Sequence, residues 1–254
     1  MIVRAKNIAQ TVVVLKGFLS TAEVETLMRV GPSGCRQEHD RSEELDFEHA
    51  VWRCETQLDA DTTSGGAAVH ARLLEVMRAT DGDVWRNLPL DYSPSSSSSS
   101  LSSSSPASSS RTKTGNRKRG SGGGAASMKH LHPETEYISY DADAALRRWR
   151  ARSTYCDADP PVLPGIGPHV DNGSCVTLIA ALSQRCQYEG GVNLFEDGAG
   201  HGGIDDGRFV ELHPECGDVV LFRGETCEHA LTPVTRGRRN ILQIELCRHK
   251  EGRH

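Results

Sequence analysis

The stretch GIGPHVDNGSCVTLIAAL, residues 165–182, joins a histidine–aspartate pair to an apolar run. The run CVTLIAAL at 175–182 has the length and the apolar character of a buried β-strand. His169 and Asp171 stand shortly before it, with one residue between them. Side chains at positions i and i+2 of an extended strand point to the same face, so both can reach one metal ion. Two ligands do not hold a catalytic metal, and the interpretation of the pair depends on the rest of the chain.

Short apolar segments of this kind recur from residue 135 to the C-terminal end. The predicted strands are TEYISYDA, CVTLIAAL, GGVNLFED, RFVELHP, GDVVLF, HALTPV and NILQIELC. Turn residues separate most of them at the spacing typical of an antiparallel sandwich or barrel. We therefore predict a mainly β protein with an antiparallel sandwich or jelly-roll core and with flanking helices packed outside it.

The N-terminal part predicts one strand and two helices. TVVVLKGFL at 11–19 is a β-rich apolar run, and Ser20 with Glu23 three residues later forms a capping box for the next helix. That helix is expected to end at Gly31–Pro32, which is a stop signal. In AAVHARLLEVMRAT, residues 67–80, apolar side chains recur at helical spacing and predict a second helix.

A serine- and glycine-rich segment at residues 93–127 interrupts this pattern. It has almost no apolar side chains to offset the entropy of ordering, so we interpret it as a disordered insertion. Its basic cluster RTKTGNRKR is interpreted as solvated charge, with a nuclear-import or nucleic-acid patch as the alternative. The expected organisation is an N-terminal strand and helices at 1–92, this insertion, a jelly-roll core at 128–248 and a tail at 249–254.

Composition and cysteine spacing narrow the classes of protein. The 254 residues carry a formal net charge of −5, which gives no overall reason to expect a polyanionic partner. The eight cysteines contain no C-x-x-C pair, which argues against a zinc ribbon or a redox pair. We find no signal-peptide-like segment and no run long enough to span a membrane. We therefore expect an intracellular protein, cytoplasmic or nuclear, without a membrane partner.

A third ligand beside His169 and Asp171 is expected from a distant strand. His229 follows GDVVLF and precedes ALTPV, so a strand pair could present it inward, whereas His213 at a strand end is expected to face solvent. Two imidazoles and one carboxylate form the facial triad suited to non-haem Fe(II), with three coordination positions open. A zinc enzyme is the alternative, although the helical H-E-x-x-H pair is absent.

A 2-oxo acid could occupy two of the open positions, and a distal carboxylate on it would need a cationic anchor. Arg239 follows His229 by ten residues, and its planar fork matches a carboxylate better than a lysine does. Arg236 and Arg238 are close competitors. Strand alternation places Arg238 and Arg239 on opposite faces, which does not by itself choose between them.

Four motifs in order resemble those of the 2-oxoglutarate- and Fe(II)-dependent dioxygenases, most closely the prolyl 4-hydroxylase-like branch. They are His169-Val170-Asp171, GGVNLF at 190–195, GDVVLF at 217–222 and HALTPVTRGRR at 229–239. The resemblance covers residues 10–90 loosely and 136–247 well. It implies a double-stranded β-helix core of the jelly-roll, cupin-like type.

The resemblance also implies roles for residues. It makes His169, Asp171 and His229 the iron ligands. It also makes Arg239 the anchor of 2-oxoglutarate and Tyr140 a hydrogen-bond partner of the 2-oxoglutarate carboxylate. The implied cofactors are Fe(II), 2-oxoglutarate and O₂, with ascorbate as reductant. The implied reaction converts 2-oxoglutarate to succinate and CO₂ and hydroxylates a C–H bond of a protein or peptide, at proline.

Two departures from the family concern the substrate. An insertion at 141–165 separates Tyr140 from His169, and its RRWRAR segment is interpreted as a surface helix, with a substrate-binding lip as the alternative. Asn193 stands where some prolyl hydroxylases have threonine. The rival functions are an oxidative demethylase of nucleic-acid bases, which only RTKTGNRKR favours, and a non-catalytic jelly-roll binding module, against which the intact triad argues.

Two further residues receive no catalytic role from the sequence. Asp218 is interpreted as a solvated turn residue, and Cys227 is interpreted as a packing residue.

Overall fold

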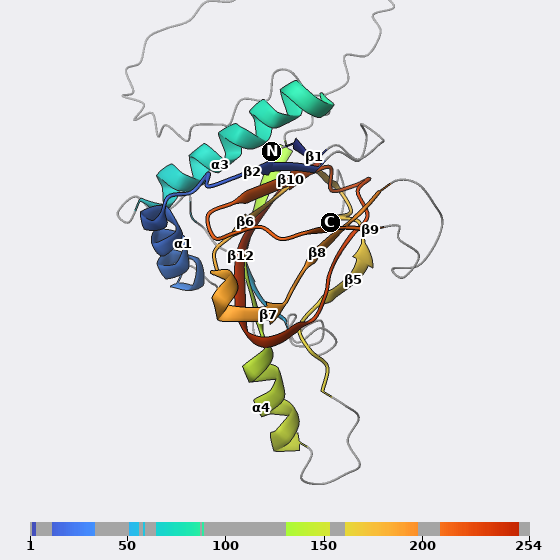
Figure 1. Ribbon diagram of the computed structural model, residues 1–254. Helices are drawn as coiled ribbons and strands as arrows, with labels where there is room; N and C mark the ends of the chain where they lie inside the picture. The colour runs from blue at the N-terminus through green and yellow to red at the C-terminus, as the bar shows by residue number, and fades with distance from the viewer. Residues whose placement is uncertain are drawn as a thin grey trace, which may run out of the picture.

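The computed structural model describes residues 2–3, 12–33, 51–55, 58, 65–86, 88, 131–152, 161–197 and 209–248. The segment 93–127 and the tail 249–254 lie outside these residues, so the proposed insertion and tail stay predictions. The described residues form a mainly β protein with helices at its sides (Figure 1). None of the described helices is long and apolar enough to cross a membrane.

Two antiparallel sheets form the core. The larger sheet has the order β1-β2-β10-β6-β12-β4-β3, with β7 paired to β12 off this path. Its strands are β1 (Ile2–Val3), β2 (Val12–Leu15), β3 (Val51–Glu55), β4 (Leu131–Asp141), β6 (Ser174–Ala181), β7 (Tyr188–Gly190), β10 (Val219–Phe222) and β12 (Val234–Arg248). The smaller sheet has the order β5-β11-β8-β9, with β5 (Ile166–His169), β8 (Asn193–Glu196), β9 (Phe209–Leu212) and β11 (His229–Leu231). This arrangement confirms the predicted jelly-roll core.

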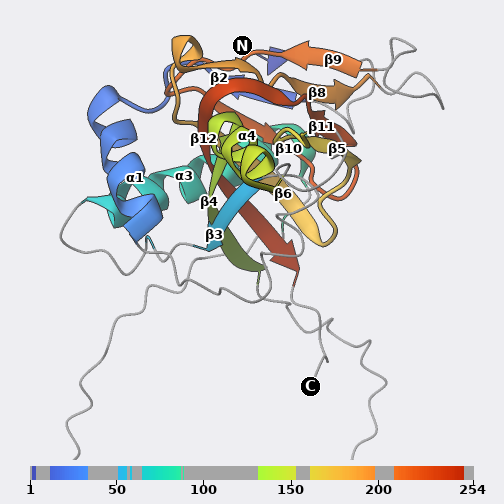
Figure 2. The ribbon, with the colours of Figure 1, turned by 90° about the horizontal axis from the view of Figure 1, so that it is seen from below.

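Helices lie on the side of the larger sheet that faces away from the smaller one (Figures 1 and 2). They are α1 (Thr21–Ser33) and α3 (Gly66–Thr80), the latter continued by a π-helical turn at Asp81–Trp85. A short 3₁₀ turn at Arg185–Gln187 precedes β7. The remaining helix, α4 (Ala142–Arg152), follows β4 directly and extends away from the two sheets (Figure 1).

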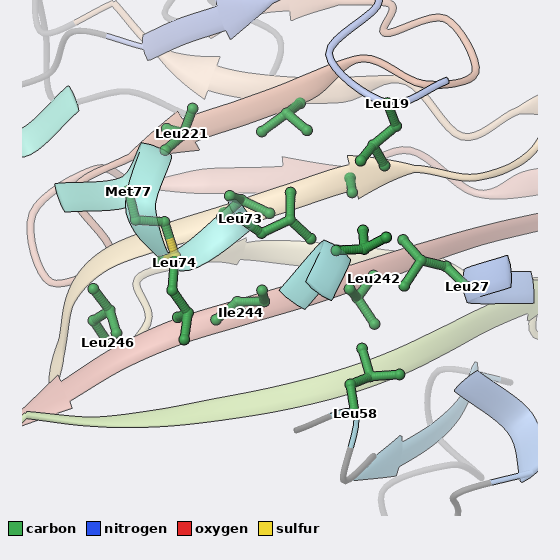
Figure 3. Close-up of a cluster of buried hydrophobic side chains, with 14 of the residues drawn as sticks. Leu19, Leu27, Leu58, Leu73, Leu74, Met77, Leu221, Leu242, Ile244 and Leu246 are labelled. Carbon is green, nitrogen blue, oxygen red and sulfur yellow. The ribbon is translucent and has the colours of Figure 1, made fainter. Parts of the chain in front are cut away.

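Strand alternation produces two hydrophobic clusters, one on each face of the larger sheet. Leu242, Ile244 and Leu246 of β12 join the outer cluster, where they meet apolar side chains of α1 and α3 (Figure 3). Ile241 of the same strand joins the inner cluster, together with Phe195 of the smaller sheet. The inner face of β12 is therefore enclosed between the sheets, and it is the face that lines the cavity described below.

Helix α1 begins as predicted and ends within one residue of the predicted stop. The backbone N–H of Ser20 donates to Glu23 Oε2 at 2.8 Å, and the backbone N–H of Glu23 donates to Ser20 Oγ at 3.4 Å, so the capping box is present. Its last residue is Ser33, directly after the predicted stop signal Gly31–Pro32. A Cβ atom on Gly31 would collide with the ring of Tyr137 on β4. The glycine therefore permits close helix–sheet packing, which a reading of local stop signals misses.

The interpretation of Asp218 as a solvated turn residue is wrong. Its side chain is buried, and it accepts hydrogen bonds from Lys16 Nζ at 2.6 Å and from the backbone N–H groups of Gly17 and Glu215 at 2.8 Å. Asp218 thus joins the turn after β2 to the start of β10. Cys227 is fully buried in the inner cluster, as the packing interpretation expects.

Asp218→Asn should lower the free energy of unfolding by about 1.5–3 kcal/mol at neutral pH, the usual range for hydrogen bonds to a charged group. Burial acts to raise the pKa of Asp218, but Lys16 and the two backbone donors hold it below its ordinary value. The contribution of the carboxylate is therefore present at neutral pH and is lost as the pH falls below the ordinary carboxyl range, about 4.

Urea unfolding at neutral and acid pH measures this effect. The deficit of Asp218→Asn relative to the parent protein should shrink as the pH falls. Glu25→Gln, at an exposed position on α1, is the matched control and should unfold like the parent. Equal unfolding midpoints of Asp218→Asn and the parent at neutral pH would contradict the assigned role.

Candidate metal centre and its cavity

Two paired strands of the smaller sheet bring His169, Asp171 and His229 together. β5 and β11 are antiparallel, with His169 directly opposite His229. Asp171 follows β5 by two residues and turns its carboxylate toward both rings. The Nε2 atoms of His169 and His229 each lie 3.6 Å from Asp171 Oδ1. The three residues predicted from separate parts of the sequence therefore meet at one point.

Backbone carbonyls orient both imidazole rings. His169 Nδ1 lies 2.8 Å from the carbonyl oxygen of Gly167, and His229 Nδ1 lies 3.1 Å from that of Cys227. A carbonyl oxygen only accepts, so each Nδ1 carries the proton in these bonds. The Nε2 lone pairs are thereby left for a metal ion, the usual arrangement of a ligating histidine. The ring of Phe222, centred 4.6 Å from that of His229, supports the second imidazole from behind.

Thr177 orients the carboxylate, and the sequence interpretation did not include it. Its hydroxyl donates to Asp171 Oδ2 at 2.7 Å, which leaves Oδ1 directed toward the histidines. Gly224 completes this support, because its carbonyl accepts the Asp171 N–H at 3.0 Å and a Cβ there would lie 2.6 Å from Thr177 Oγ1. The available signal was a single hydroxyl residue in the middle of the apolar run 175–182.

The charge state of Asp171 suits a ligand. Burial acts to raise the pKa of Asp171, but the two adjacent imidazoles of His169 and His229 and the hydrogen bond from Thr177 hold it below the ordinary value. The carboxylate is therefore ionised at neutral pH and available to a cation.

The geometry of the three donors fits one divalent ion. Metal–nitrogen and metal–oxygen bonds are roughly 2 Å long, so two atoms that share an ion lie at most about 4 Å apart. Both separations between Asp171 and a histidine, 3.6 Å each, satisfy this limit, and all three donor atoms lie within 4.8 Å of one another. Two imidazoles and one carboxylate, with the remaining positions open, are the donor set of non-haem Fe(II) centres.

A cavity of about 570 Å³ lies against the three donors and is lined by both sheets. The inner face of β12 contributes Arg239, Ile241, Gln243 and Glu245 to its wall. The solvent-exposed fraction of these residues increases along β12, from 2% at Arg239 through 9% at Gln243 to the partly exposed Glu245. The buried end of the cavity is therefore cationic, and its open end is not.

The direction of its side chain distinguishes Arg239 from the other two candidate anchors, Arg236 and Arg238. It is buried, donates from Nη2 to Asn193 Oδ1 at 3.0 Å and lies over the ring of Tyr140, 5.5 Å from the ring centre. Tyr140 is its direct partner in the β4–β12 register and also lines the cavity. Arg238 instead pairs with Asp141 on the exposed face.

Arg236 is likewise exposed and paired with Glu189. Of the three arginines, Arg239 alone can meet a carboxylate inside the cavity. Gly191 makes room for it, since a Cβ atom there would lie 3.0 Å from Arg239 Cδ, and its φ of +60° also favours glycine.

Asn193 contributes an unsatisfied donor beside Arg239. Its Oδ1 accepts from the guanidinium, whereas its Nδ2 is buried without a hydrogen-bond partner. A buried unpaired amide is costly, so such a group indicates a missing ligand. An acceptor placed between the Asn193 amide and Arg239 would satisfy both donors, and a carboxylate is the natural candidate.

The remaining sequence predictions fall away from the cavity. RRWRAR belongs to α4, where Arg147, Arg148 and Arg150 are exposed, as expected of a surface helix. Helix α4 begins directly after Asp141, which is opposite Arg238 in the strand register. Arg238 is the neighbour of the buried Arg239, so the helix starts beside the buried end of the cavity and not beside its open end. His213 is exposed, lies 3.3 Å from Glu211 and is not among the residues that line the cavity.

Comparison with known protein structures identifies the fold. No protein-family model and no curated protein matches the sequence. A Pseudomonas putida prolyl-4-hydroxylase structure aligns over 94% of this chain and 92% of its own, with a TM-score of 0.51 and 12% identity. A Trichoplax adhaerens prolyl hydroxylase, solved with a peptide fragment of the hypoxia inducible factor oxygen degradation domain, aligns over 93% and 83%, with a TM-score of 0.52 and 11% identity. The chain has the prolyl hydroxylase fold.

Within the prolyl hydroxylase fold, Thr177 is expected to act on metal affinity through Asp171. Thr177→Val keeps the size of the side chain but removes the donor, and should weaken metal binding about 10–100-fold, the usual effect of losing a group that orients a ligand. Calorimetric titration with Mn²⁺, a redox-stable substitute for Fe²⁺, measures the affinity.

Thr177→Ser is the matched control, since it keeps the hydroxyl and should bind Mn²⁺ nearly as the parent does. Parent-like affinity in Thr177→Val would show that Asp171 needs no such support.

Proposed function

We propose that the protein is a 2-oxoglutarate- and Fe(II)-dependent dioxygenase that hydroxylates a C–H bond, with peptidyl proline as the substrate group. The observation that carries the proposal is the placement of the donors His169, Asp171 and His229 and of the buried Arg239 on the walls of one cavity. A metal-binding triad alone fits several enzyme classes. A buried guanidinium in the same cavity adds the requirement for a co-substrate carboxylate.

Each residue has a defined task in this scheme. His169, Asp171 and His229 would hold Fe(II), which supplies activation of O₂ and a chelation point for a 2-oxo acid. Arg239 pairs with the distal carboxylate of 2-oxoglutarate. The Asn193 amide is a second donor beside it, and the Tyr140 hydroxyl is the third group that we assign to this carboxylate.

Apolar walls make these polar contacts effective. Ile179, Ile241 and Leu231 line the cavity between its polar groups and limit the access of water. Ionic hydrogen bonds are stronger in such a low-dielectric surrounding than in bulk water. The same walls would protect the oxidising centre from side reactions, with ascorbate restoring Fe(II) after unproductive turnover.

A protein or peptide substrate is favoured over a nucleic acid. The Trichoplax adhaerens enzyme of this fold was solved with a peptide, which supports the choice by analogy. Glu136 and Glu245 line the cavity of the present chain. Their carboxylates would repel a phosphate backbone, so a base demethylase is the weaker proposal.

The metal part of the proposal is tested with His169→Ala. The variant should lose high-affinity Mn²⁺ binding, and it should release no succinate above background when given Fe²⁺, ascorbate, 2-oxoglutarate and proline-containing peptides. His213→Ala, which changes an exposed histidine outside the cavity, should behave as the parent. Succinate release that survives in His169→Ala would exclude this metal site.

The co-substrate part is tested with Arg239→Ala. Loss of a buried charge partner costs about 2–5 kcal/mol, so the dissociation constant of 2-oxoglutarate for the Mn²⁺-loaded protein should rise about 30-fold or more. Arg238→Ala removes the neighbouring guanidinium on the exposed face and should change this constant less than about twofold. An unchanged affinity in Arg239→Ala would overturn the anchor.

A further inference from the structure

Two buried hydroxyl groups lie behind the metal donor Asp171. Ser174 and Thr177 are both fully buried on β6, and the Ser174 Oγ atom lies 2.9 Å from Thr177 Oγ1. Thr177 Oγ1 in turn lies 2.7 Å from Asp171 Oδ2. Ser174 and Thr177, the hydroxyl pair, thus form a short chain of hydrogen bonds that ends on the carboxylate.

An irregularity in β6 brings the hydroxyl pair to one side of the strand. Residues at positions i and i+3 of a regular strand point to opposite faces. The register between β12 and β6 shifts here, since Leu246 is opposite Val176 whereas the next residue, Cys247, is opposite Ser174. An extra residue is therefore inserted in β6, and such bulges redirect side chains beside active sites. The bulge explains how the Ser174 hydroxyl reaches Thr177.

The two hydrogen bonds can run in only one direction. A carboxylate oxygen only accepts, so the single proton of the Thr177 hydroxyl is donated to Asp171. Thr177 Oγ1 then has no proton left for Ser174 and must accept, which makes Ser174 the donor. The order is therefore from Ser174 to Thr177 to Asp171. The bond from Ser174 keeps the Thr177 proton directed at the carboxylate, because Thr177 cannot turn it back toward its own donor.

The segment that follows β10 closes over the hydroxyl pair. A Cβ atom on Gly224 would lie 2.6 Å from both Ser174 Cβ and Thr177 Oγ1. The same segment is bonded to the turn that carries the metal ligand, because the Asp171 N–H donates to the Gly224 carbonyl at 3.0 Å. The Glu225 N–H also donates to the Ser174 carbonyl, at 2.9 Å. The hydroxyl pair is thereby shielded from solvent, and its hydrogen bonds are made within the protein.

The bond from Thr177 leaves one oxygen of Asp171 for a metal ion. Oδ2 accepts from Thr177, whereas Oδ1 lies 3.6 Å from the Nε2 atoms of both histidines. Carboxylates bind cations through one oxygen or through both. If Oδ2 were released, it could take one of the coordination positions that two imidazoles and a single carboxylate oxygen leave open on Fe(II). In the proposed function those positions are needed by 2-oxoglutarate and O₂.

We propose that Ser174 and Thr177 hold Asp171 as a metal ligand through one oxygen only, and thereby keep a coordination position open for 2-oxoglutarate. The inference rests on the proposed function and adds Ser174 as a positioning residue of its metal centre. Ser174 is not among the residues that line the cavity, so it acts through Thr177. Loss of its hydroxyl affects the co-substrate more than the metal, because a second bound carboxylate oxygen strengthens the hold on the ion while it blocks the open position.

Calorimetric titrations of Ser174→Ala test the proposal without turnover. The dissociation constant of Mn²⁺ should rise no more than about threefold, because the Thr177 hydroxyl remains. The dissociation constant of 2-oxoglutarate for the Mn²⁺-loaded variant should rise about tenfold, because the 2-oxo acid must displace the second carboxylate oxygen. Ser174→Cys keeps a weaker donor at the same place, and its dissociation constant for 2-oxoglutarate should lie between those of the parent and Ser174→Ala.

A Co²⁺ spectrum distinguishes a change of ligation from a general loss of stability. The visible absorption of bound Co²⁺ depends on the number and arrangement of its ligands, so Co²⁺-loaded Ser174→Ala should differ from the parent before 2-oxoglutarate is added. Thr135→Val is the matched control, since it removes a buried hydroxyl that lies 3.0 Å from His70 Nε2 on the outer face of the larger sheet. It should keep the parent spectrum, with both affinities within about twofold of the parent.

The outcomes separate this inference from the function on which it rests. A parent-like Co²⁺ spectrum or a parent-like affinity for 2-oxoglutarate in Ser174→Ala overturns the inference and leaves the dioxygenase standing. Mn²⁺ and 2-oxoglutarate affinities that fall to the same extent also overturn it, since they indicate a lost ligand and not an added oxygen. Failure of the parent to bind 2-oxoglutarate overturns the proposed function, and a changed Co²⁺ spectrum of Ser174→Ala then still assigns the hydroxyl pair to the control of Asp171. If Ser174→Ala does not fold, the same comparisons are decided with Ser174→Cys.

Discussion

The alternation of side chains along β12 is the constraint on which the rest of the structure depends. A β-strand turns successive residues to opposite faces, so one strand can serve the core and the cavity together. Leu242, Ile244 and Leu246 pack under the helices, while Arg239 and Glu245 line the cavity. A register slip by one residue would place the charged residues against α3 and the leucines in the cavity. Folding and site assembly are therefore the same event in this chain.

The outer cluster protects that register. Leu73 and Met77 of α3 and Leu27 of α1 are fully buried against the larger sheet (Figure 3). Because protein interiors are densely packed, these side chains accept the leucine face of β12 and exclude the polar one. The long ladder of β12 with β4 and β6 then places Tyr140 opposite Arg239. The position of Arg239 is thus determined by packing on the opposite side of the sheet.

The parts of the site that could be predicted are those whose chemistry depends on residue type and spacing. His169, Asp171 and His229 could be connected because two imidazoles and a carboxylate define a recognisable donor set, and resemblance to a family then selected Arg239 among three arginines. Thr177 and the unpaired Asn193 amide could not be found in this way, since their roles depend on neighbours distant in sequence.

The same limit explains the errors in the fold prediction. Asp218 has the local sequence of a turn, and its burial follows from the approach of Lys16, about two hundred residues earlier in the chain. Gly31 next to a proline has the local sequence of a helix end, which it is, but its second role in admitting the ring of Tyr137 depends on a distant strand. Local propensity describes the alternatives open to a segment, and tertiary contacts choose among them.

Low sequence identity with a shared fold is consistent with how this centre is built. Main-chain carbonyls of residues 167 and 227 orient the two imidazoles, and many side chains at those positions would leave the carbonyls in place. The strand ladders likewise depend on backbone groups and on an apolar alternation that many sequences satisfy. Few side chains beyond the metal donors, their supporting hydroxyl and the buried cation are thus fixed by the chemistry.

The positions that face the open end of the cavity are not fixed by the chemistry of the metal centre. Glu136, Gln243 and Glu245 occupy inward-facing places on strands whose course is already determined by the outer cluster. The hydrogen bond between Gln243 and Glu245 is separate from the bonds that orient His169, Asp171 and His229, although the charge of Asp171 helps to raise the pKa of Glu245. If the proposed function holds, β12 would supply both Arg239 for 2-oxoglutarate and part of the cavity wall that faces the substrate.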